Sequence, residues 1–98
     1  MAFIQIVEYT TSKPDEVRAL SERMRAERQG NGTVRRVSVG ADREQVGRFF
    51  VIAEFDSYES AMENSDDPAT QEMSAALGAL MDAPPRFYNL DVVDQETF

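Results

Sequence analysis

General acid–base chemistry in this chain would fall to carboxylates and tyrosines, because the sequence contains no histidine and no cysteine. Two carboxylates, Glu8 and Glu54, lie within otherwise apolar segments. An apolar setting disfavours the charged form of a carboxylate, which suits such a group to taking up and returning a proton. If each instead lies at a strand end or edge facing water, it is an ordinary solvated carboxylate. We take Glu54 as a catalytic candidate and Glu8 as a substrate-binding candidate.

Tyrosines and methionines supply further candidates. Tyr9 and Tyr88 could each donate a hydrogen bond to a substrate oxygen, or could be core residues whose hydroxyl reaches water. Met62 and Met73 suit a soft pocket for a planar apolar ligand, and they also suit a core that needs flexible filler. The sequence therefore predicts Tyr9 as a catalytic residue, and Tyr88, Met62 and Met73 as substrate-binding residues.

Four strand patterns and two helical regions must position these side chains. Segments dense in β-branched and aromatic residues predict strands at Phe3–Tyr9, Val34–Val39, Arg48–Phe55 and Arg86–Val93. Hydroxyl, carboxylate and proline residues that favour the first turn of a helix stand at Ser12–Pro14, Asp56–Ser57 and Asp67–Pro68, and a helix stop is predicted at 30–32. The resulting order is β-α-β-β-α-β, in which the second helical region consists of two segments.

This order predicts an α+β fold of the ferredoxin-like type, with a four-stranded antiparallel sheet and helices on one face. Residues 1–98 are long enough for one domain and too short for two. The strands are apolar on both sides. In the third strand, for example, Phe49 and Val51 alternate with Phe50 and Ile52. Apolar area of this extent on a second face favours a homodimer joined through its sheets, although a loosely covered surface is the alternative.

The charge balance argues against several partners. The net charge of −8 repels phosphate backbones and anionic membranes, so neither a nucleic acid nor a membrane is expected as a partner. An acidic group at Glu59, Glu63, Asp66 and Asp67 lacks the spacing of a calcium loop, so no metal is expected. No apolar run approaches the length of a membrane span, and the absence of cysteine is consistent with a cytoplasmic protein.

The segment Phe55–Asn64, followed by Asp67–Pro68 and the helix that carries Met73, resembles the dimeric α/β-barrel superfamily. Its members include antibiotic-biosynthesis-monooxygenase-like proteins and some polyketide cyclases. The resemblance covers almost the whole chain and implies a small cofactor-free protein that forms a dimeric barrel. Many relatives place histidines where Asn64 and Ala69 stand here, and this chain also lacks tryptophan.

Through this resemblance Asn64 becomes the third catalytic candidate, because its amide could orient a ligand carbonyl or a reactive oxygen. A helix C-cap is the other interpretation of Asn64. We expect a small-molecule-binding dimer whose site lies between helices and sheet, and whose chemistry, if any, is a cofactor-independent oxygenation or cyclisation of an aromatic or polyketide-like compound. A non-catalytic ligand-binding dimer and a dimer with only an assembly role are the alternatives.

Overall fold

The computed structural model describes residues 1–28 and 32–98. Its elements are β1 (Phe3–Thr10), α1 (Pro14–Arg28), β2 (Val34–Ala41), β3 (Arg48–Phe55), α2 (Tyr58–Asp66), α3 (Pro68–Gly78) and β4 (Arg86–Asp91). The predicted stop at Gly30-Asn31-Gly32 falls mostly on residues 29–31, which lie outside the described residues. Gly32 is described and has a φ of 89°, in the left-handed region that favours glycine.

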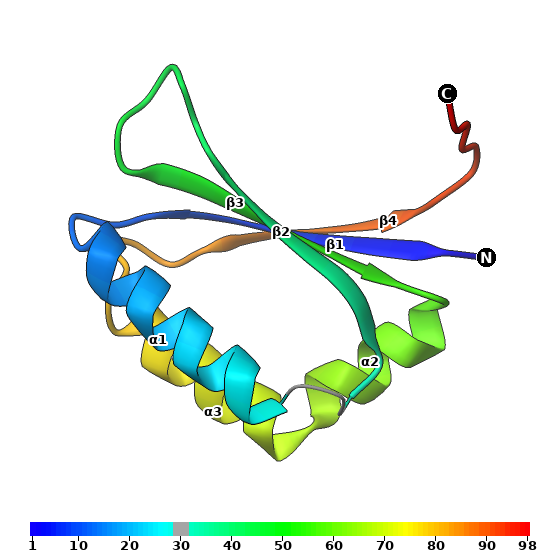
Figure 1. The fold of residues 1–98 in the computed structure, drawn as a ribbon, viewed down its shortest axis with the longest axis horizontal. Coiled ribbons are helices and arrows are strands. Elements are labelled where there is room, and N and C mark those ends of the chain that lie inside the picture. The colour runs from blue at the N-terminus through cyan, green and yellow to red at the C-terminus, as the bar shows by residue number, and fades with distance from the viewer. Residues whose placement is uncertain (29–31) are drawn as a thin grey trace.

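The four strands form one antiparallel sheet in the order β2-β3-β1-β4. This arrangement confirms the predicted ferredoxin-like α+β fold. The more polar strand β2 lies at an edge of the sheet, and residues 42–47 connect it to β3. All three helices lie on the same side of the sheet (Figure 1).

The strand register defines which side chains share a face. Tyr9 lies opposite Phe49 and Phe3 lies opposite Phe55, so these residues point toward the helices. The alternate residues point away from the helices, with Ile6 opposite Ile52 in the middle of the sheet. Both faces carry apolar residues, and the helices cover only one of them.

The tight core lies at one end of the covered face, under α2. Phe3, Phe55 and Ala61 are almost completely buried there, and Met62 packs against them. The ring of Phe3 also meets the ring of Tyr58 edge to face, with centroids 5.4 Å apart. The contact between α2 and the sheet is thus an ordinary close-packed core.

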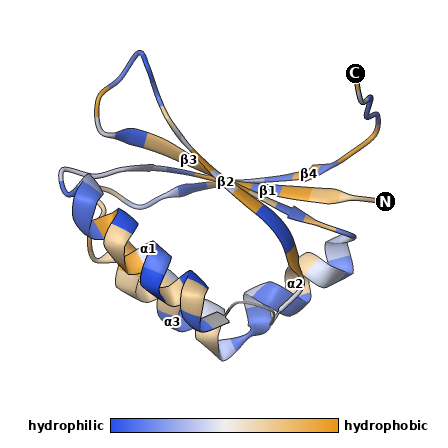
Figure 2. Cartoon of the chain, viewed as in Figure 1, coloured by the Kyte–Doolittle hydropathy of each residue, from blue (hydrophilic) through white to orange (hydrophobic). Residues whose placement is uncertain are grey.

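The other two helices form a separate pair. Helices α1 and α3 pack against each other and run side by side beneath the sheet (Figure 1). Helix α3 is largely apolar, whereas charged and apolar residues alternate along α1 (Figure 2). A cavity separates this pair from the sheet.

The three predicted helix starts agree with the structure, in which α1 begins at Pro14, α2 at Tyr58 and α3 at Pro68. Ser57 and Asp67 are the N-caps of α2 and α3, accepting from the backbone N–H groups of Ser60 and Ala69. In α1 Pro14 takes the first helical position, as predicted, and the Ser12 hydroxyl also has a partner far along the chain. This hydroxyl donates to Asp82, 3.1 Å away, and Thr11 accepts the N–H of Lys13.

Candidate ligand cavity

The principal cavity of the described chain lies between the covered face of the sheet and the α1–α3 pair, with a volume of about 800 Å³. Volumes of this size accommodate drug-sized organic molecules. Its sheet wall is mainly apolar and its helix wall carries methionine, leucine and hydroxyl side chains. The residues that line the cavity include Gln5, Tyr9, Arg25, Phe49, Asn64 and Met73.

Tyr9 anchors the sheet wall. Its side chain is 7% exposed, and its ring stacks on Phe49 with centroids 5.5 Å apart and an angle of 20° between the planes. Burial raises the pKa of the Tyr9 hydroxyl above its ordinary value, and the positive charge of Arg25 acts in the opposite direction. At neutral pH Tyr9 is therefore a protonated hydrogen-bond donor and not a base.

Asn64 lines the cavity from the last turns of α2. Its side-chain oxygen accepts from the hydroxyl of Thr70 at 3.3 Å, and its backbone carbonyl accepts the N–H of Asp67, which is the C-cap residue. Asn64 itself is therefore not the C-cap. The Thr70 contact fixes which end of the amide is engaged and leaves its NH₂ group as the end that could meet a ligand carbonyl.

Two further polar residues were not identified in the sequence. Gln5 and Asn89 lie directly opposite each other on β1 and β4, and the amide nitrogen of Gln5 donates to the amide oxygen of Asn89 at 3.1 Å. Gln5 lines the cavity. The only signal in the sequence was a lone polar residue inside an apolar strand, which does not by itself distinguish a site from an edge.

The structure separates the predicted site residues into two groups. Tyr9, Asn64 and Met73 line the cavity. Glu8, Glu54 and Tyr88 do not, because the strand register turns them to the uncovered face. Their expected role inside the cavity is thereby corrected.

Met62 is corrected as well, since it packs against the tight core under α2 and not in the cavity. Its position is the one expected for flexible core filler, the other interpretation that the sequence allowed.

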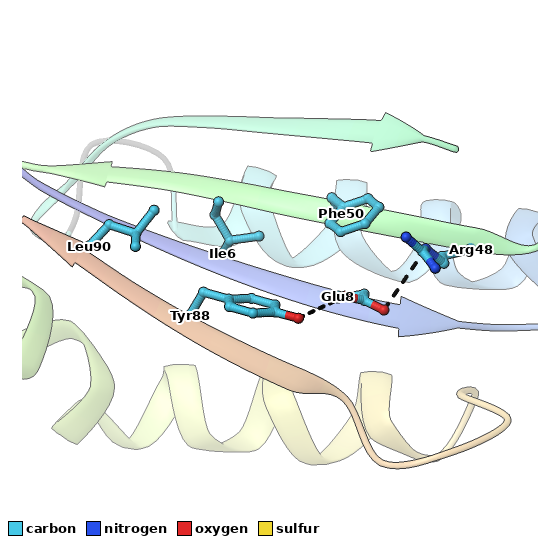
Figure 3. Close-up of a pocket in the computed structure, with 6 residues that line it drawn as sticks. All are labelled: Ile6, Glu8, Arg48, Phe50, Tyr88 and Leu90. Carbon is cyan, nitrogen blue, oxygen red and sulfur yellow. Dashed lines mark hydrogen bonds and ion pairs between the residues drawn. The ribbon is translucent and has the colours of Figure 1, made fainter. Parts of the chain in front are cut away.

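On the uncovered face Glu8 and Tyr88 belong to a polar row across a shallow hollow of about 270 Å³ (Figure 3). The Tyr88 hydroxyl donates to Glu8 at 3.0 Å, and the Arg48 Nε lies 3.9 Å from Glu8 and 3.1 Å from Asp42. The guanidinium of Arg48 also lies over the ring of Phe50. Each charged member of this row therefore has a neighbour of opposite charge.

Two kinds of feature are absent from the described residues. They contain no group of three or more histidine, cysteine or acidic side chains that could hold a metal ion. No helix among them is both long and apolar enough to cross a membrane.

Comparison with known proteins identifies the fold. No family model matches the chain, and no curated protein matches its sequence. Solved structures do match over nearly their full length. SnoaB, a cofactor-independent oxygenase from Streptomyces nogalater, aligns with a TM-score of 0.81 at 15% identity over 96% of this chain and 95% of its own.

Two more structures extend the comparison. Rv0793 from Mycobacterium tuberculosis aligns with a TM-score of 0.80 at 16% identity, over 99% of this chain and 100% of that one. An antibiotic biosynthesis monooxygenase aligns with a TM-score of 0.76 at 13% identity, over 96% and 100%. The chain therefore has the fold of the antibiotic-biosynthesis-monooxygenase-like proteins, as its sequence pattern indicated.

Proposed function

We propose that this protein binds a small, largely apolar organic molecule with a ring system in the cavity between the sheet and the α1–α3 pair. The observation that carries the proposal is the cavity itself, with its volume of about 800 Å³ and its wall of aromatic, methionine and β-branched side chains. Apolar concave sites with a few polar groups are the usual form of small-molecule sites. The stacked rings of Tyr9 and Phe49 offer a flat surface to such a ligand.

Neutral polar groups would orient the ligand. The Tyr9 hydroxyl is a donor, and the amides of Asn64 and Gln5 can each donate to a carbonyl or accept from a hydroxyl. Gln5 and Tyr9 lie four residues apart on β1 and Asn64 lies on α2, so the three groups can address different parts of one ring system. A polyketide-like compound with several oxygen substituents fits this pattern.

A cofactor-independent oxygenation or cyclisation is the reaction that we propose for this site. The likeness to SnoaB supports it at the level of fold alone. In such an oxygenation dioxygen transfers one oxygen atom to the substrate, and the other leaves as water with hydrogen from the substrate. Tyr9 would hold the substrate oxygen at which negative charge develops, and Asn64 would fix the orientation of the ring.

Binding without turnover is the second candidate, and one observation favours it. The acidic residues that line the cavity, Asp15 and Glu22, are both exposed on α1, and Tyr9 is protonated at neutral pH. A proton must therefore leave through the substrate's own acidity or through solvent. A dimer with only an assembly role is not favoured, because the cavity is not filled by its own side chains.

We also propose that two copies of the chain pair through the uncovered faces of their sheets. The support is the apolar area on that face, where Ile6, Phe50 and Leu90 surround the hollow shown in Figure 3. Pairing would bury this area and complete a barrel of two sheets. The chain is proposed to act as a single cytoplasmic domain, to which its lack of cysteine is suited.

Binding of phenylnaphthylamine, a neutral fluorescent ring compound, tests the cavity. Because the chain has no tryptophan, an introduced tryptophan is the one indole that can transfer excitation energy to the bound probe. Ser74→Trp places an indole on α3 in the cavity wall, whereas Glu72→Trp places one on the same helix outside it. We expect wild-type protein and Glu72→Trp to bind the probe, and Ser74→Trp to bind it weakly because the indole occupies the space.

Equal affinity of all three proteins would reject the cavity as the site. Turnover is tested separately, by dioxygen consumption with hydroxylated polycyclic aromatics. Consumption that Tyr9→Phe and Asn64→Ala both reduce, while probe binding persists, supports the enzyme. Binding with no consumption across the series supports the non-catalytic candidate.

A further inference from the structure

Arg25 is the cavity-lining arginine that forms no ion pair with any carboxylate of the described residues. Six charged side chains line the cavity, and four of them are arginines: Asp15, Arg18, Glu22, Arg25, Arg35 and Arg36. Three of these arginines are neutralised by carboxylates, in the pairs Arg18–Asp15 at 3.5 Å, Arg35–Asp56 at 2.8 Å and Arg36–Glu54 at 2.6 Å. Within residues 1–28 and 32–98 Arg25 has no carboxylate at ion-pair distance. Glu22, three residues earlier on α1, is not paired with it either.

The helix geometry directs Arg25 to the cavity. Val17, Ser21 and Arg25 follow one another at four-residue spacing, so they share the face of α1 that lines the cavity. The Nε of Arg25 donates to the backbone carbonyl of Ser21 at 3.3 Å, which ties the guanidinium to this face. Across the cavity its charge reaches Tyr9, whose pKa it lowers against the larger effect of burial.

We propose that Arg25 selects ligands that carry an anionic oxygen substituent, such as a phenolate, an enolate or a carboxylate, on an apolar ring system. This inference rests on the proposed cavity function and narrows its ligand class. The apolar wall would hold the rings while the guanidinium pairs with the charged oxygen, for which its planar fork of donors is suited. A neutral ligand of the same shape would leave this donor fork to solvent.

The negative net charge of the chain means that any preference for anionic ligands must arise at a particular site. At a net charge of −8 the protein repels anions over most of its surface, so a preference for an anion must come from a particular site. Arg25 is the cavity-lining cation that no carboxylate of the described residues neutralises. A preference for the anionic member of a matched ligand pair is therefore attributable to it.

Two fluorescent probes that differ by one anionic group test the inference. Anilinonaphthalene sulfonate carries a sulfonate on the same two ring systems as neutral phenylnaphthylamine. We expect Arg25→Gln to weaken binding of the anionic probe about fivefold, the limit for a solvent-exposed ion pair, and to leave the neutral probe unchanged. Arg25→Lys should restore most of the loss, because it restores the charge.

Arg23→Gln is the matched control, since it removes the same charge from an exposed position of α1 that does not line the cavity. The inference is overturned if Arg23→Gln weakens the anionic probe as much as Arg25→Gln, or if Arg25→Gln weakens both probes equally. If the wild-type protein binds the neutral probe and Arg25→Gln leaves the affinity for the anionic probe unchanged, the preference for anionic ligands is rejected and the cavity function stands. If neither probe binds, or if Ser74→Trp does not weaken their binding, the proposed cavity function is rejected together with the preference for anions.

Discussion

The hydroxyl of Tyr88 donates to the carboxylate of Glu8 at 3.0 Å on the face of the sheet that the helices leave open. This bond joins β4 to β1, and β4 is held in the sheet by β1 alone. Glu8 is also 3.9 Å from Arg48 on β3, so one carboxylate connects three strands. The uncovered face is thus tied together by polar contacts as well as by its apolar residues.

We expect Tyr88→Phe to lower the free energy of unfolding by about 1 kcal/mol, the usual net contribution of one hydrogen bond. Urea unfolding monitored by circular dichroism measures the change. Tyr58→Phe is the control, because the edge-to-face contact of Tyr58 with Phe3 uses the ring and not the hydroxyl. Equal destabilisation by both variants would show that the Tyr88 bond contributes nothing of its own.

Leu90→Glu tests the proposed pairing of two copies. Leu90 is 46% exposed beside the hollow of the uncovered face, so in a dimer a carboxylate there would be buried without a partner. Light scattering after size exclusion should give a dimer for the wild-type protein and a monomer for this variant. Val46→Glu adds the same charge to a fully exposed loop residue and should remain dimeric. A monomeric wild-type protein at micromolar concentration would refute the pairing.

Thr11→Val should destabilise the protein by about 1–3 kcal/mol, although the side chains are similar in shape. Thr11 is 2% exposed, donates to the carbonyl of Leu80 at 2.6 Å and accepts from the N–H of Lys13 at 3.0 Å. Valine would leave both backbone groups without this partner. Thermal unfolding measures the loss, and Thr10→Val, at the half-buried neighbouring position, is the comparison. A cost no greater than that of Thr10→Val would contradict the importance of these bonds.

The hydroxyl of Tyr9 should make the free energy of unfolding depend on pH in the alkaline range. Because burial raises the pKa of its hydroxyl in the folded state, folding favours the protonated form. This contribution is complete below the unfolded pKa of about 10 and is lost as pH rises through the higher folded pKa. Urea unfolding at a series of alkaline pH values should show a steeper loss for the wild-type protein than for Tyr9→Phe. Identical slopes would mean that the hydroxyl titrates normally in the folded protein.

The fold could be predicted because each strand and helix carries its own local pattern. The sequence of Arg48–Phe55 predicts a strand whatever lies beside it, and Asp67–Pro68 predicts a helix start through capping chemistry alone. The bond from the Ser12 hydroxyl to Asp82 could not be predicted in the same way, because Asp82 lies far along the chain.

The candidate site was predicted less well, for a different physical reason. Alternation along β3 separates Phe49 from Glu54, but it does not say which side the helices cover. With both faces apolar, the two choices are equivalent until the helices are placed. Asn64 was found only through the family resemblance. Arg25 was not singled out in the sequence, because its lack of an ion-pair partner is a property of the folded chain.

The tight core and the cavity adjoin on the covered face and share Phe55. Phe3, Phe55 and Ala61 are packed under α2, and the cavity extends from there along the α1–α3 pair. Met73 and Ser74 lie on α3, outside that core, so changes in their size and polarity should cost little folding free energy, whereas a change at Phe55 would disturb core and cavity together. For the proposed ligand site this means that the helix side of the wall can diverge while the scaffold keeps its stability.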